Sequence, residues 1–129
     1  MSEQIRILVV DDQPRTRQSL KALLATCPQV KEVKEAALAR EAVRVMQESQ
    51  SDVVLMDVRM PEMNGLQATR LIKAKWPQVK VIVLTLYAEY AAAAQAAGAD
   101  AFVCKGEPTE KLLTTLTEVT SLQYKRGAR

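Results

Sequence analysis

The sequence predicts an α/β fold in which a doubly wound sheet of five parallel strands is flanked by five helices. Two observations support this prediction. Short aliphatic runs recur without polar alternation, which is typical of parallel strands covered on both faces. Between them lie segments whose apolar residues recur every three or four positions, as in amphipathic helices. Strands that alternate with helices favour right-handed crossovers and a three-layer sandwich.

The expected strands are short runs rich in valine, isoleucine and leucine. In chain order they span residues 5–10, 30–36, 52–56, 79–84 and 101–104. The second of them, V-K-E-V-K-E-A, is a weaker strand candidate than the others.

The expected helices span residues 14–27, 38–46, 66–76, 88–97 and 109–123. Pro14 fits a first helical turn, whereas Pro28 and Pro77 stop the first and third helices. The fourth helix is rich in alanine and is followed by Gly98, which can take the left-handed conformation of a helix C-cap. The fifth has an apolar stripe made of Leu112, Leu113, Leu116 and Val119.

Length and composition indicate one folded domain. The chain has 129 residues, of which 48% are hydrophobic and 26% charged. Aromatic residues are only 4%, which disfavours an RNA-binding sheet with stacked rings. Three of the 18 Lys and Arg residues lie at the end of the chain, and the remainder equal the 15 Asp and Glu residues. We therefore expect a neutral domain over residues 1–124 and a basic tail, or the start of a linker, over residues 125–129.

The chain contains no histidine, which excludes a Ser-His-Asp or Cys-His nucleophile pair and a His-ligated zinc ion. Cys27 and Cys104 are isolated thiols without metal-ligand spacing. The first ten residues do not resemble a secretory leader, and no apolar run approaches the roughly 20 residues that span a bilayer. A cytoplasmic setting without a membrane anchor is the expectation.

Polar side chains follow four of the expected strands. Asp11 and Asp12 follow the first, Asp57 follows the third, Thr85 follows the fourth and Lys105 follows the fifth. In an open parallel sheet, ligands bind beyond the carboxyl ends of the strands. The sequence therefore predicts that these side chains converge on one edge of the sheet.

Three carboxylates about 5 Å apart would repel one another by roughly 3 kcal/mol per pair at an effective dielectric constant near 20. Lys105 supplies part of the compensating charge, and a divalent cation is the natural remainder. Oxygen ligands favour Mg²⁺ over a softer metal. Such an ion, with Lys105 and Thr85, would also stabilise an incoming phosphoryl group.

Four motifs together resemble the receiver domain of response regulators, the proteins of two-component signalling. They are the pair Asp11-Asp12, the run D-V-R-M-P-E-M-N-G-L at residues 57–66, Thr85, and A-G-A-D-A-F-V-C-K at residues 97–105. The resemblance covers nearly the whole chain and implies a (βα)5, flavodoxin-like fold. The residues of these motifs are most similar to those of receivers that carry a C-terminal helix-turn-helix output domain.

The resemblance implies that Asp57 accepts a phosphoryl group from the phosphohistidine of a sensor histidine kinase or from a small acyl phosphate. Asp11, Asp12, Asp57 and the backbone carbonyl of Arg59 would hold Mg²⁺. Lys105 and Thr85 would complete the catalytic set. The domain would not be an enzyme beyond its own phosphorylation and slow dephosphorylation.

The resemblance also implies a switch formed by Thr85 and Phe102, whose movement changes the surface around the fourth helix, fifth strand and fifth helix. Phosphorylation would promote a homodimer. The protein would bind DNA only through an output domain, and the sequence shows no such module after Gln123. Tyr87 and Arg59 would limit water access to the acyl phosphate. One departure from the family pattern is Gly106, where many receivers have proline.

Three other functions are considered. A Mg²⁺-dependent phosphohydrolase with an aspartate nucleophile needs a second aspartate two residues later, where this chain has Arg59. A flavin- or nucleotide-binding module needs a glycine-rich cradle after the first strand, and V-V-D-D-Q-P-R has no glycine. A degenerate receiver that takes no phosphoryl group is disfavoured because all five polar positions are present.

Overall fold

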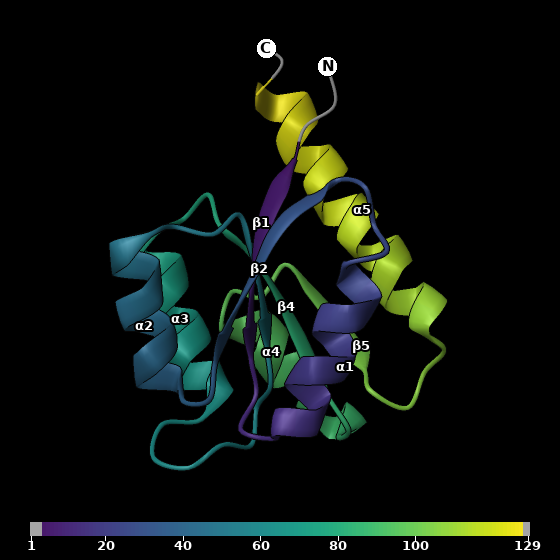
Figure 1. The fold of residues 1–129 in the computed structure, drawn as a ribbon. Helices are drawn as coiled ribbons and strands as arrows, with labels where there is room; N and C mark the ends of the chain where they lie inside the picture. The colour runs from purple at the N-terminus through teal and green to yellow at the C-terminus, as the bar shows by residue number, and fades with distance from the viewer. Residues whose placement is uncertain (1–3, 128–129) are drawn as a thin grey trace.

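The computed structural model of the protein describes residues 4–127 (Figure 1). Five parallel strands form one sheet in the order β2-β1-β3-β4-β5. The strands are β1 (Ile5–Val10), β2 (Val30–Ala36), β3 (Val53–Met56), β4 (Lys80–Thr85) and β5 (Ala101–Cys104). The helices are α1 (Pro14–Leu24), α2 (Ala39–Glu48), α3 (Gly65–Lys75), α4 (Ala91–Ala96) and α5 (Thr109–Gly127). The predicted doubly wound α/β fold is confirmed.

Helices cover both faces of the sheet, because successive strand residues point to opposite sides. Leu8 and Val54 belong to an apolar cluster that includes buried residues of α2, α3 and α4. Ile7 and Leu55 belong to a second cluster that includes buried residues of α1 and α5. Figure 1 shows α2 and α3 on one side of the sheet and α1 and α5 on the other. The continuous aliphatic runs of the sequence are therefore strands buried on both faces.

The register aligns the carboxyl ends of the strands. Val10 at the end of β1 pairs with Met56 at the end of β3, and Thr85 at the end of β4 pairs with Cys104 at the end of β5. The residues that directly follow these strands therefore emerge at the same edge of the sheet.

Several element boundaries differ from the sequence prediction. The helix expected over residues 88–97 is a 3₁₀ turn, η1 (Ala88–Tyr90), followed by the short α4. Alanine favours a helix but buries little apolar surface, and Ala94 is the one buried residue of α4. The third and fourth strands each begin one residue later than expected. Gly98 has the expected positive φ of 99°.

The last helix extends beyond the expected end at Gln123 and continues to Gly127. Lys125 and Arg126 of the expected basic tail are therefore helical, and Arg129 lies outside the described residues. No helix within residues 4–127 is both long and apolar enough to cross a membrane.

Candidate functional site

Three acidic side chains lie together at the carboxyl edge of the sheet. Asp11 and Asp12 follow β1, Asp57 follows β3, and one carboxylate oxygen from each lies within 4.8 Å of the others. Asp11 and Asp57 are buried, with 2% and 8% of their surfaces exposed, whereas Asp12 is half-buried. This is the only such group of metal-binding side chains within the described part of the chain.

Asp11 is held by four hydrogen bonds. Its backbone N–H donates to the carbonyl of Ala36 (3.1 Å), and its carbonyl accepts from the Arg17 guanidinium (2.7 Å). Its carboxylate accepts from the backbone N–H of Gln13 (2.8 Å) and from the Lys105 ammonium (2.6 Å). These bonds fix both the backbone and the side chain of Asp11.

Asp57 is fixed between the sheet and the loop that follows β3. Its backbone N–H donates to the carbonyl of Val10 (3.0 Å), and its Oδ1 accepts from the backbone N–H of Val58 (2.8 Å). Its Oδ2 lies 3.4 Å from the Lys105 Nζ. Burial, the largest influence, raises the pKa of Asp57 above its ordinary value; Lys105 opposes this shift and Asp11 adds to it. The ionised form of Asp57 is therefore destabilised by burial, and a further cation would reduce this destabilisation.

Gly65 lies directly against Asp57. A Cβ atom at Gly65 would be 1.8 Å from the carbonyl oxygen of Asp57, a distance that no side chain can occupy. The Gly65 N–H also donates to the carbonyl of Val58 (2.8 Å). Gly65 begins α3, whose N-cap Asn64 accepts hydrogen bonds from the next two residues of the helix. The first turn of α3 therefore supports the backbone on which Asp57 sits.

Lys105 and Thr85 are joined through the sheet. The backbone N–H of Lys105 donates to the carbonyl of Thr85 (2.8 Å), which continues the β4–β5 ladder by one residue. Thr85 is fully buried, and its hydroxyl accepts from the N–H of Tyr87 (3.4 Å). The glycine at position 106 does not prevent Lys105 from contacting both Asp11 and Asp57.

A groove of about 420 Å³ adjoins the acidic cluster. Its lining includes Asp12, Arg59 and Tyr90. The Arg59 guanidinium lies 4.5 Å from the centre of the Tyr87 ring, and the Tyr87 and Tyr90 rings meet edge to face at 6.2 Å. Arg59 and Tyr87, which are expected together to limit water access, are thus in contact and join the loops that follow β3 and β4.

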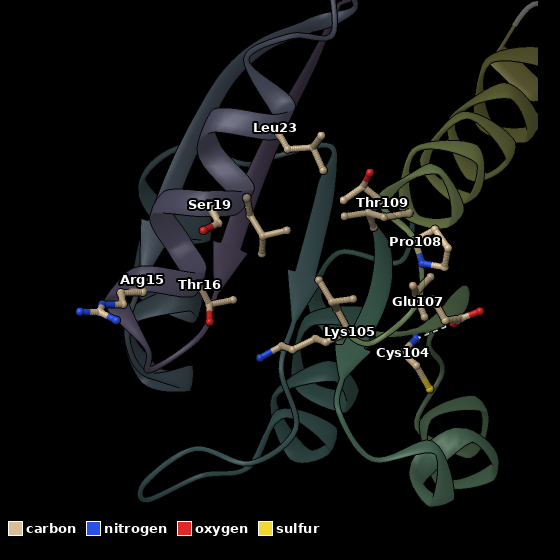
Figure 2. A pocket seen from close by; sticks show the side chains of 13 residues that line it. Arg15, Thr16, Ser19, Leu23, Cys104, Lys105, Glu107, Pro108 and Thr109 are labelled. Atoms are coloured by element: carbon tan, nitrogen blue, oxygen red, sulfur yellow. Dashed lines mark hydrogen bonds between the residues drawn. The ribbon is translucent and has the colours of Figure 1, made fainter.

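A second groove, of about 320 Å³, lies between α1 and α5. Figure 2 shows Thr16 and Ser19 of α1 on one side and Pro108 and Thr109 on the other, with Lys105 between them. Its lining is completed by Arg15, Leu20, Leu23, Leu84, Val103, Cys104, Glu107 and Leu112. Lys105 therefore contributes both to the acidic cluster and to this groove.

The proposed switch residues have different surroundings. Thr85 is buried at the edge of the sheet, whereas Phe102 of β5 is half-buried and packs against the cluster beneath α3 and α4. Phe102 pairs with Val83 of β4, two residues before Thr85. The movement of this pair, and the role of the Arg59 carbonyl as a metal ligand, remain predictions.

The acidic cluster suits a hard divalent cation. All of its side-chain ligand atoms are carboxylate oxygens, which Mg²⁺ prefers. Among the described residues one ammonium contacts the cluster, and it cannot balance three carboxylates. The groove beside Asp12 gives water a route to the cluster, and Mg²⁺ keeps several water ligands. The residues present therefore fit Mg²⁺.

Comparison with known proteins identifies the family. Residues 7–117 match the family model described as "Response regulator receiver domain". The chain belongs to the response regulator receiver family. The expected resemblance is confirmed. The match covers β1 from Ile7 onward, all of the other four strands and the acidic cluster of this receiver domain.

Similar proteins agree with this assignment. The receiver domain is 38% identical to the "Uncharacterized transcriptional regulatory protein YhcZ" of Bacillus subtilis (strain 168), over 94% of this chain and 57% of that protein. It matches the crystal structure of a CheY-like response regulator receiver domain protein from Methanospirillum hungatei JF-1 with a TM-score of 0.88 and 30% identity, over 96% of this chain and 99% of that one. It also matches the response regulator TrrA from Thermotoga maritima, crystallised in complex with Mg²⁺-BeF, with a TM-score of 0.82 and 31% identity, over 92% and 99% of the two chains.

The chain spans about half the length of the curated relatives it matches, several of which are transcriptional regulatory proteins. This agrees with the resemblance to receivers of DNA-binding regulators.

Sequence reasoning missed one residue of the site. Arg17 contacts the acidic turn, but a single arginine on an amphipathic helix has no spacing signal that separates it from a surface residue. Gly65 belongs to the run at residues 57–66, but its close contact with the Asp57 carbonyl depends on the path of the loop and is seen only in the structure.

Proposed function

We propose that this receiver domain acts in the cytoplasm as a phosphorylation-activated switch in which Asp57 accepts the phosphoryl group. The observation that carries the proposal is the environment of Asp57: a buried carboxylate that shares the Lys105 ammonium with Asp11, next to a groove lined by Asp12 and Val58. A carboxylate that burial destabilises, and that cations can reach, is suited to reaction with a phosphoryl donor.

In the proposed reaction, an oxygen of Asp57 attacks phosphorus and forms a P–O bond. The bond from phosphorus to the donor breaks, and the donor leaves with the electron pair: the histidine of a sensor kinase, or the carboxylate of a small acyl phosphate. Lys105 holds a phosphoryl oxygen through its ammonium, and the Thr85 hydroxyl donates a hydrogen bond to another. Asp11, Asp12, Asp57 and the Arg59 carbonyl would hold Mg²⁺, which would supply positive charge for the phosphoryl oxygens.

The proposed output is a change of surface. Thr85 is buried with a hydroxyl that makes only a long 3.4 Å contact, so its movement toward a new acceptor breaks no strong hydrogen bond. Phe102 is half-buried and pairs with Val83, two residues before Thr85, and its ring would turn inward into the space that Thr85 vacates. The changed surface would promote a homodimer or act on an output domain that binds DNA.

A phosphohydrolase is the weaker alternative. Its general acid would be a carboxyl group at position 59, where this chain instead has Arg59, whose guanidinium lies over the Tyr87 ring. The site therefore suits a lasting acyl phosphate rather than rapid turnover.

The test is intact mass after incubation with acetyl phosphate and Mg²⁺. Wild type is expected to gain the mass of one phosphoryl group, whereas Asp57→Asn and wild type in chelator gain none. Asp100→Asn is a control because Asp100 is an aspartate outside the site that pairs with Lys73. A mass gain in Asp57→Asn, or many turnovers of a generic phosphate ester by wild type, would reject the proposal.

A further inference from the structure

Arg17 links the acidic turn to the second strand. From α1, its Nη1 donates to the backbone carbonyl of Asp11 (2.7 Å), and its Nε donates to the carboxylate of Glu35 in β2 (3.1 Å). The Arg17 side chain is 17% exposed, which is well covered for an arginine. Two different nitrogens of one planar guanidinium are thus engaged at the same time, and this fixes its orientation.

The carbonyl that Arg17 holds belongs to the peptide group between Asp11 and Asp12. The orientation of that peptide determines the direction in which the Asp12 side chain leaves the backbone. The other two acids are also fixed through their side chains, Asp11 by Lys105 and Asp57 by Val58. Among the described residues, no hydrogen bond or ion pair holds the Asp12 carboxylate itself. Its place in the cluster therefore depends on the backbone of the turn.

We infer that Arg17 is a positioning residue for Asp12: it holds the Asp11–Asp12 peptide so that the Asp12 carboxylate faces the Mg²⁺ site. The inference rests on the proposed function, because it assumes that the acidic cluster binds Mg²⁺. Glu35 contributes indirectly by anchoring the guanidinium.

Charge alone predicts the opposite effect. A cation beside an acidic cluster repels Mg²⁺, so removing the charge of Arg17 would tighten Mg²⁺ binding if charge were its only influence. If Arg17 positions Asp12, removing it weakens binding, since partners that orient metal ligands are typically worth about 10- to 100-fold in affinity. The sign of the change in affinity therefore separates the two accounts.

Lys21 provides a matched control. It lies one helical turn after Arg17, and its ammonium is 3.5 Å from the same Glu35 carboxylate, but it makes no described contact with the acidic turn. Lys21→Met removes a positive charge and an ion pair to Glu35, and it leaves the bond between Arg17 and Asp11 in place. Arg17→Met keeps the apolar stem of the side chain, and Arg17→Lys keeps the stem and the charge.

The experiment measures the Mg²⁺ dissociation constant of each variant by titration calorimetry, and its melting temperature in chelator. Arg17→Met is expected to bind Mg²⁺ at least about tenfold more weakly than wild type, Arg17→Lys to lie between the two, and Lys21→Met to stay within about twofold. The rate of phosphorylation by acetyl phosphate should fall in Arg17→Met at low Mg²⁺ and recover at high Mg²⁺.

Unchanged or tighter Mg²⁺ binding by Arg17→Met would overturn the inference, while a phosphoryl mass gain by wild type would leave the proposed function standing. Absence of Mg²⁺ binding by wild type would overturn both. If the melting temperature shows that Arg17→Met is unfolded, Arg17→Lys decides: wild-type affinity at wild-type stability would overturn the inference, and weaker binding would support it.

Discussion

In the proposed reaction Asp57 attacks phosphorus as an anion, yet it is buried where its charge is disfavoured. Burial raises its pKa, and Lys105 only partly offsets that effect. The cation and the phosphoryl group that the site is proposed to bind would reduce the unfavourable energy of this buried charge. The same property that destabilises the carboxylate therefore suits it to react. This balance has a measurable consequence for stability.

Asp57→Asn is expected to stabilise the protein in chelator at neutral pH. Between the ordinary pKa of an aspartate and the raised pKa of Asp57, the folded state binds more protons than the unfolded state, so wild-type stability falls as pH rises through that window. Asparagine cannot ionise, so the stability advantage of Asp57→Asn should grow across the window and then level off. Urea unfolding from pH 3 to 8 measures this difference. A difference that shrinks with rising pH would contradict the predicted shift.

Gly65→Ala is expected to lower stability and phosphorylation together. The added Cβ cannot lie 1.8 Å from the Asp57 carbonyl oxygen, so the loop and Asp57 must move apart. Overpacking against a backbone costs about 1–3 kcal/mol or more, and the displaced carboxylate should accept phosphate at least several-fold more slowly. Gly106→Ala is the control, because a Cβ there meets nothing within 4 Å. Equal behaviour of the two alanine variants in urea unfolding and in the mass assay would refute this account.

At the scale of elements, the loops that follow β3 and β4 are held together by Arg59 and Tyr87. These loops flank the groove that leads to the acidic cluster, since Arg59 and Tyr90 line it and Tyr87 contacts both. A guanidinium stacked on a ring is worth about 0.5–1 kcal/mol at an exposed site. That is enough to bias the loops toward a closed arrangement without locking them.

The lifetime of the acyl phosphate should therefore depend on this pair. Tyr87→Ala and Arg59→Ala are each expected to shorten the half-life several-fold, because water reaches phosphorus more easily. The double variant should lose little more than either single variant, since each change removes the same contact. Leu86→Ala is the control: Leu86 is 65% exposed beside Tyr87. Half-lives measured by mass after removal of the donor test this, and unchanged half-lives in both single variants would rule it out.

For the whole molecule, Mg²⁺ binding should raise the melting temperature. The cluster draws on two separate turns and needs the folded sheet, so an ion that binds only the folded state stabilises it by about 2.7 kcal/mol at one hundred times the dissociation constant. The melting temperature should rise by several degrees in MgCl₂ and return in chelator. KCl at matched ionic strength controls for screening of charge. An equal rise in KCl would show that screening, not binding, is responsible.

Much of this architecture could be predicted because a strand that is buried on both faces of the sheet has an uninterrupted aliphatic sequence, as in V-V-L-M of β3. The gathering of Asp11, Asp57 and Lys105 follows from parallel strands, whose carboxyl ends share an edge. Such predictions rest on hydrophobic periodicity and strand topology, and both can be inferred from the sequence alone.

The remaining features depend on distances between segments that are remote in sequence. The contact between Arg59 and Tyr87 requires the lengths and directions of two loops. The alanine run itself is helical as α4, but residues 88–90 before it form the 3₁₀ turn η1, and the sequence has no signal that separates the two. Likewise, the bonds of Arg17 need the exact end of β2, where Glu35 lies.

The ion pair between Lys105 and Asp11 joins positions 94 residues apart. A nascent chain that has left the ribosome only as far as α4 already carries all three acids but lacks the ammonium that accompanies them. In the proposed reaction Lys105 holds the phosphoryl group, so a truncated translation product, or one cut by a protease before β5, would lack part of the acceptor site. Under that proposal, the ability to be phosphorylated requires that synthesis and folding of the chain have reached the final strand.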